Sequence, residues 1–215
     1  VENGIERSRA IGWDRAEWET LTGATNLGSG LPDSRPGCGS LSVDPQYALD
    51  LAVRFGGESM TSRRVHCAPL EDEMEAAFDR GWTDGLPVVP PTERRVLAML
   101  QGTSRKPDEV VAVVPPDLVD CTVEKVAINA VMAGCKPQYM PVLVALAEAM
   151  ADPGYGVEHS GNTPGAETLI TINGPIIKDL EFNYEQGALR DGFMANTTVG
   201  RWWRLYLRNV AGFIL

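Results

Sequence analysis

The chain has 215 residues, of which 44% are hydrophobic and 22% charged, and its formal net charge is -10. This length suffices for one sizeable core, and the acidic excess repels phosphate groups, so neither nucleic acid nor an anionic membrane surface is an expected partner. No apolar run approaches the roughly 18 residues that a membrane-spanning helix needs, and no basic segment followed by an apolar one marks an export signal at the start. A cytoplasmic protein with reduced thiols is therefore expected.

The first 45 residues differ in composition from the rest. Residues 22–37 are rich in glycine, proline, serine and aspartate, which bury little apolar area and are typical of an extended segment. Trp13 and Trp18 supply aromatic side chains that can hold such a segment on another surface. We therefore divide the chain into an extended N-terminal arm, 1–45, and an α/β domain, 46–215, which we expect to be incomplete at its C-terminus.

Helical patterns recur through the α/β domain. Apolar side chains at helical spacing define the helices, N-cap residues such as Thr92 and Thr122 mark where they start, and glycines such as Gly81 and Gly134 mark where they end. The helices predicted in this way span residues 45–55, 70–80, 93–100, 122–134, 138–150 and 197–210. Asn196 or Thr197 is expected to cap the last of these helices.

Two short segments with strand character lie between the predicted helices. Residues 110–114 are rich in valine, which predicts a buried strand, and residues 168–173 predict a second strand that ends at Gly174. Helices would therefore alternate with short strands, so the expected fold class is α/β.

The most unusual local sequence is 82–92, in which Thr83, Asp84 and Gly85 predict a turn and prolines stiffen the residues after this turn. Rigid loops of this kind often carry binding or catalytic groups. Asp84 is therefore a candidate acid–base residue, and Thr83 is a candidate substrate-binding residue. The alternative is a turn whose side chains only cap their own backbone.

The predicted helix 122–134 carries three polar side chains, Glu124, Lys125 and Asn129, among small apolar ones. Glu124 and Lys125 are adjacent, so they point in different directions and form no helical ion pair. One interpretation is a polar cluster in a cleft, with Glu124 as acid or base, Lys125 as electrostatic stabiliser and Asn129 binding the substrate. The alternative is two solvated charges and one core amide whose hydrogen bonds are satisfied.

The four cysteines form no Cys-x-x-Cys pair and match no zinc-site spacing, so no metal site is predicted, and nothing identifies a cofactor. Cys38 lies beside glycines whose backbone amides can approach its sulfur, which favours a reactive thiol. Cys135 precedes Lys136, a cation that opposes the unfavourable effect of the helix C-terminus on a thiolate. Both are candidate catalytic thiols, and the alternative for each is a cysteine without a chemical role.

Three further residues are candidates for substrate binding. Asn173 closes the predicted strand 168–173, at the end where open α/β sheets place ligands. Arg201, with Arg204 and Arg208, forms a stripe along the last predicted helix that can bind an anionic ligand or a partner's carboxylates, although a solvated face is the alternative. Asn196 begins the same helix.

These segments resemble the C-terminal region of the UGSC family of selenoproteins and their cysteine homologues. The resemblance covers about residues 70–210 and rests on five motifs: WTDGLPVVPPT (82–92), GTSR (102–105), TVEKVAINAVMAGC (122–135), INGP (172–175) and NTTVGR (196–201). The family's name motif, selenocysteine or cysteine followed by Gly, Ser and Cys, implies thiol or selenol redox chemistry. Cys38, Gly39 and Ser40 match its first three positions, and Leu41 stands at the fourth.

Three functions from different classes fit these features. The first is a subunit of an enzyme that converts a small molecule, as an oxidoreductase, lyase or hydrolase, with the candidate residues around one polar cleft. The second is a thiol-based redox protein that uses Cys38 or Cys135. The third is a non-catalytic structural subunit of a homo- or hetero-oligomer. In it the arm and the apolar tail, residues 211–215, pack on partner chains.

Overall fold

The computed structural model describes Leu49, Val53 and residues 60–68, 71–115, 118–156 and 168–212. The chain divides into two compact units, Val1–Gly57 and Glu58–Leu215, and every helix and strand named below belongs to the second. The predicted arm, Cys38 and the end of the apolar tail lie outside the described residues. So does most of the predicted helix 45–55, of which Leu49 and Val53 are described and helical.

In the described part of the second unit, two short helices precede the sheet. Helix α4, Glu73–Asp79, starts where the Asp72 side chain accepts hydrogen bonds from two backbone N–H groups of the first turn. Helix α5, Glu93–Leu100, has the bounds that the sequence predicts. Thr92 occupies its N-cap position with extended backbone, although its side chain makes no capping hydrogen bond.

Among the residues that the structure describes, the sheet consists of two antiparallel strands, β1 (Val110–Val114) and β2 (Val119–Thr122). The strand at 110–114 is therefore confirmed. The prediction that it is buried is wrong, because Val110 and Val113 are exposed and only one face of β1 contacts the core. Strand β2 was not predicted, since its four residues form a strand by pairing with β1 and carry little strand signal of their own.

Helix α6, Val123–Ala133, is the centre of the core and packs against α5, α7 and α9. The Thr122 side chain caps its start, and Gly134 ends it with a positive φ of 82°, a conformation that strains residues with a Cβ. Apolar side chains lie around most of its circumference, as expected of a helix enclosed by other elements.

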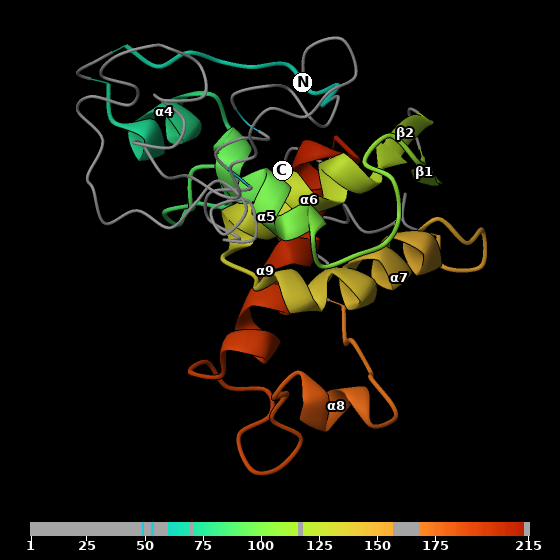
Figure 1. The fold of residues 1–215 in the computed structure, drawn as a ribbon. Helices are drawn as coiled ribbons and strands as arrows, with labels where there is room; N and C mark the ends of the chain where they lie inside the picture. The colour runs from blue at the N-terminus through green and yellow to red at the C-terminus, as the bar shows by residue number, and fades with distance from the viewer. Residues whose placement is uncertain are drawn as a thin grey trace, which may run out of the picture. The chain divides into compact units, whose positions relative to one another are not determined.

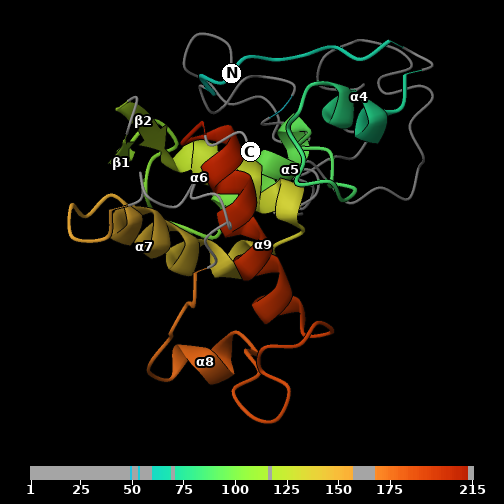
Figure 2. The same ribbon diagram turned by 180° about the vertical axis from the view of Figure 1, so that it is seen from behind.

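Three α-helices follow α6 in the described part of the chain. Helix α7, Met140–Met150, begins directly after a 3-10 turn at Pro137–Tyr139 and packs against α6 and β1. The short α8, Ile176–Asp179, precedes the long α9, Met194–Asn209, whose apolar face packs along α6 (Figure 1, Figure 2). This packing fixes the loop at 82–92, because side chains of α9 bind its backbone.

Two predictions in the C-terminal part are wrong. Residues 168–173 form no strand, since no described segment pairs with them and extended backbone without a partner is not a sheet. Helix α9 begins at Met194, three residues before the predicted start, and Phe193 occupies its N-cap position. Neither Asn196 nor Thr197 is the cap, because both lie inside the first turns.

The described part thus combines helices with one small antiparallel sheet, a mixed α/β composition. None of the helices in this part is both long and apolar enough to cross a membrane.

Two buried polar atoms among the described residues have no hydrogen-bond partner, the indole nitrogen of Trp203 and the hydroxyl of Tyr206. Burial raises the pKa of the Tyr206 phenol, and the nearby Cys121 thiol raises it further. A thiol is a weak hydrogen-bond acceptor, so the nearby Cys121 does not satisfy the hydroxyl.

Replacing Tyr206 by phenylalanine is therefore expected to raise the free energy of unfolding, by about 1 kcal/mol, because it removes an unsatisfied polar group and keeps the ring. The control is Trp202→Phe, which removes a buried indole that donates to the Val126 carbonyl at 3.1 Å and is expected to destabilise. Urea denaturation measures both changes. A loss of stability in Tyr206→Phe would show that the hydroxyl has a partner.

Candidate functional site

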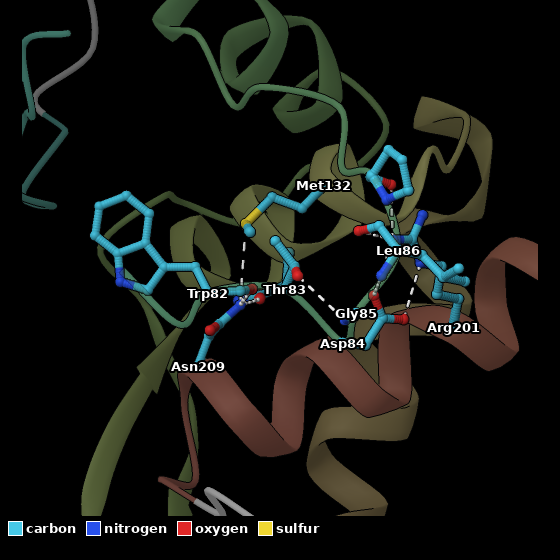
Figure 3. A network of polar contacts seen from close by, with 10 residues as sticks. Trp82, Thr83, Asp84, Gly85, Leu86, Met132, Arg201 and Asn209 are labelled. Atoms are coloured by element: carbon cyan, nitrogen blue, oxygen red, sulfur yellow. Dashed lines mark hydrogen bonds and ion pairs between the residues drawn. The ribbon is translucent and has the colours of Figure 1, made fainter. Parts of the chain in front are cut away.

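The loop that connects α4 to α5 is held by its own side chains. The Thr83 hydroxyl accepts a hydrogen bond from the Gly85 N–H at 3.1 Å, and an Asp84 carboxylate oxygen accepts one from the Leu86 N–H at 3.4 Å (Figure 3). Gly85 has a φ of 94°, which favours glycine. The predicted turn is confirmed, with the side-chain capping that the alternative interpretation describes.

Asp84 also forms the main ion pair of this region, with Arg201 of α9. The guanidinium of Arg201 donates to both carboxylate oxygens, from Nε at 3.0 Å and from Nη2 at 2.9 Å (Figure 3). Nη2 also donates to the carbonyls of Leu86 at 3.2 Å and Pro87 at 2.8 Å. Such a two-pronged pair is geometrically specific, and it fixes the loop to α9.

The ion pair determines the charge state of Asp84. Burial alone would raise the pKa of Asp84, but the hydrogen bonds and positive charge of Arg201 outweigh burial and hold the pKa below its usual range. The stability that this group contributes is therefore present at neutral pH and is lost as the pH falls through the lowered folded-state pKa. At neutral pH Asp84 is an ionised, paired carboxylate.

A second polar chain runs from the loop into α6. The Asn209 amide nitrogen donates to the Trp82 carbonyl at 3.1 Å (Figure 3). It also donates to the Asn129 side-chain oxygen at 2.9 Å. Asn129 is buried, and its own amide nitrogen donates to the Lys125 carbonyl at 2.9 Å. Asn129 is thus a core amide with its hydrogen bonds satisfied.

Glu124 is buried in a different place, at the start of α6, with 1% of its surface exposed. One oxygen accepts from the backbone N–H of Thr61 at 2.8 Å and from its hydroxyl at 3.0 Å, and the other accepts from the Ser62 N–H at 3.1 Å. Successive backbone N–H groups commonly form such anion sites. Lys125 points elsewhere, and its ammonium donates to the Asp120 carbonyl at 2.5 Å.

The predicted site residues therefore fall into several groups. Thr83, Asp84 and Arg201 lie together on the loop and α9. Glu124 and Cys135 lie at opposite ends of α6, about 16 Å apart along the helix axis for eleven residues. Asn173 is exposed just before α8.

Asn196 belongs to a further group, in the first turns of α9. Its amide nitrogen donates to the carbonyls of Asn183 at 2.9 Å and Ala188 at 3.1 Å, and its oxygen accepts from the Asn183 N–H at 2.9 Å. Its observed role is therefore to fix the segment before α9.

The buried thiols have raised pKa values. Burial raises the pKa of Cys135 to about 12, against a smaller opposing effect of the Thr198 hydroxyl, and raises the pKa of Cys121 to about 11. A reactive Cys135 is therefore disfavoured, because the sulfur is buried and the loss of solvation destabilises its thiolate. Cys67 is exposed, and no cluster of three or more metal-ligating side chains occurs among the described residues.

Sequence reasoning missed Asn209, Thr61 and Ser62, and it described Arg208 too simply. Arg208 donates to the Gly81 carbonyl at 3.2 Å, and Arg204 lies over the Trp203 ring at 5.7 Å, so the arginine stripe binds protein groups and is not merely a solvated face. The three-residue and four-residue spacing on α9 identified these arginines, but no local pattern identified their partners.

Comparisons with models of protein families, with curated proteins and with solved structures gave no match. The resemblance to the UGSC family therefore stays a prediction.

The raised pKa values predict slow alkylation of the buried thiols. At pH 8, native Cys135 is expected to react with iodoacetamide about a thousandfold more slowly than a thiol of ordinary pKa, because its thiolate fraction is smaller by that factor. Peptide mapping by mass spectrometry measures each cysteine, with exposed Cys67 as internal reference and urea-unfolded protein as control. Labelling of Cys135 as fast as that of Cys67 would restore it as a candidate nucleophile.

Proposed function

We propose that this chain is a non-catalytic assembly subunit of an oligomer. The observation that carries the proposal is that the polar side chains expected to do chemistry bind groups of the chain itself. Asp84 is held by Arg201, Glu124 by Thr61 and Ser62, and Asn129 by Asn209. A side chain that acts on a substrate needs a hydrogen-bonding position that is left for this substrate. Polar networks that are satisfied within the chain instead make the fold more rigid.

Exposed apolar side chains support the same proposal. Outside the core, tyrosine, phenylalanine, methionine and leucine side chains lie in solvent between the end of α7 and the start of α9. Aromatic residues and methionine are enriched at protein interfaces, and clustered exposed apolar groups mark binding sites. The proposal includes an extended N-terminal arm, 1–45, and an apolar tail that pack on partner chains, in a cytoplasmic assembly.

The native mass of the full chain tests this function. Light scattering coupled to size-exclusion chromatography is expected to give a mass above the 23.3 kDa of one chain, at neutral pH and moderate salt. Deleting residues 1–45 is expected to reduce the number of chains per particle, which is the measured mass divided by the mass of one shortened chain. A species of one-chain mass at every concentration, with and without the arm, would contradict the proposal.

A second candidate is an enzyme that acts on a small molecule at the Asp84–Arg201 pair. The pair joins two candidate site residues that are 117 positions apart in the chain. The Cys135 thiol lies near Thr198, which belongs to α9 as Arg201 does. A substrate carboxylate would compete with Asp84 for the Arg201 guanidinium. Thermal unfolding with a panel of small carboxylic acids tests this candidate. Stabilisation in the wild type that is absent in Arg201→Lys would favour it over the assembly function.

A further inference from the structure

Residues 63–68, here called the exposed segment, lie near the start of the second unit. Each of these residues is exposed, and none of them belongs to a helix, strand or turn on the way to α4 (Figure 1). Within the described part, no backbone N–H or C=O group of residues 63–67 forms a hydrogen bond. A protease binds its substrate as an extended strand through such main-chain groups, so this backbone is available to one.

Two adjacent basic side chains begin the exposed segment. Arg64 pairs with Glu93 at 2.8 Å, but its side chain is 62% exposed, and an ion pair at the surface contributes little stability. Arg63 lies over the Trp82 ring at 5.6 Å, a contact that is also weak for an exposed side chain. Either arginine can therefore turn into the specificity pocket of a protease that selects basic residues.

The other basic side chains of the described part are presented less favourably. Most of them lie within helices, whose backbone groups are already hydrogen-bonded, and Lys106 and Lys136 directly precede proline, which restricts the backbone before it. The closest match is Arg190, which is exposed and outside the helices. It lies among turns, however, and its N–H donates to the Gly187 carbonyl at 2.8 Å. Arg190 therefore serves as an internal reference for cleavage.

Glu124 holds the residues directly before Arg63. Its carboxylate accepts hydrogen bonds from the N–H and the hydroxyl of Thr61 and from the N–H of Ser62. A protease that takes Arg64 into its pocket also binds the main chain before it, so it has to compete with Glu124 for this stretch. The rate of cleavage should therefore follow the fraction of molecules in which these hydrogen bonds are open.

We propose that the exposed segment is a cleavage site for serine proteases of trypsin-like specificity, and that Glu124 limits access to it. In the reaction the bond between the Arg64 carbonyl carbon and the Val65 nitrogen breaks. The hydroxyl of a water molecule adds to that carbon, and its hydrogen goes to the nitrogen. The cut leaves the first unit, Val1–Gly57, on one fragment and α4 to α9 on the other. The inference does not depend on the assembly function.

Digestion of the native full chain with a small amount of trypsin tests the site, with mass spectrometry of the products. Among the described residues, the first cut is expected after Arg63 or Arg64, and the fragment that ends at Leu215 should persist while Arg190 is cut more slowly. The double variant Arg63→Gln/Arg64→Gln should lose this fragment and keep the slower cut. A first cut after Arg190 would overturn the site, as would cleavage after Arg63 and Arg64 only in urea-unfolded chain.

Two further variants test the role of Glu124. Thr61→Val removes the hydroxyl that donates to Glu124 and keeps the branched shape, so cleavage after Arg63 and Arg64 is expected to become about tenfold faster. The matched control is Ser62→Ala, because Ser62 binds Glu124 through its backbone N–H, and a change below about twofold is expected. Synthetic peptides of residues 58–68 with each sequence correct for the preference of trypsin itself, and circular dichroism checks the fold. Equal corrected rates in the two variants would overturn the role of Glu124.

Discussion

Replacing Gly102 by alanine is expected to lower the free energy of unfolding by about 3 kcal/mol, one of the largest effects available from a single added methyl group. Gly102 follows α5 where the chain passes the 3-10 turn at Pro137–Tyr139. A Cβ built at Gly102 would lie 1.8 Å from the Pro137 carbonyl oxygen and 2.5 Å from its carbonyl carbon. These atoms belong to the backbone and cannot rotate away, so α5 and the start of α7 would have to separate.

The matched control is Gly200→Ala, in the exposed middle of α9. A Cβ there meets nothing within 4 Å, and alanine is the better helix former, so this variant is expected to gain about 0.5–1 kcal/mol. Urea denaturation of both variants measures changes of opposite sign. Equal and small effects would mean that α5 and the Pro137 turn are further apart than the structure has them.

Local signals allowed much of the helical fold to be predicted. The helix at 122–134 follows from Thr122 at one end, Gly134 at the other and apolar spacing between them, and α6 has these ends. Capping residues and the glycines that end helices act only on backbone groups a few residues away, so helix ends can be recognised from the sequence alone. The same holds for α5 and for the turn at Thr83.

Strands and partners depend on residues far away in the chain, which local patterns do not contain. Residues 168–173 have strand composition but no pairing partner within the described ranges, whereas β2 is a strand because β1 lies beside it. The candidate site shows the same limit. Asp84 and Arg201 were each identified as candidates, but the sequence did not predict that they pair across 117 positions. It also did not predict that Glu124 accepts hydrogen bonds from Thr61 and Ser62, which lie 63 and 62 positions away.

Replacing Glu124 by glutamine is expected to destabilise the chain by about 3 kcal/mol, since a buried carboxylate that accepts hydrogen bonds contributes more than a neutral acceptor. Glutamine has nearly the same shape as glutamate. Its amide nitrogen, however, is a hydrogen-bond donor, and it would face backbone N–H groups that are donors as well. The three hydrogen bonds from Thr61 and Ser62 cannot all be kept, because glutamine offers one acceptor oxygen in place of two, so at least one part-buried donor loses its partner. The favourable position of a negative charge near the start of α6 is lost as well.

Two measurements locate this effect. Urea denaturation gives the loss of stability, and trypsin cleavage after Arg63 and Arg64, which directly follow Ser62, is expected to become faster because Glu124 no longer holds this segment on α6. The control is Glu75→Gln, an exposed first-turn glutamate of α4, for which a change below about 0.5 kcal/mol is expected. If Glu124→Gln and Glu75→Gln were equally mild, and cleavage after Arg63 and Arg64 were unchanged, the carboxylate would not be what holds residues 60–62 in place.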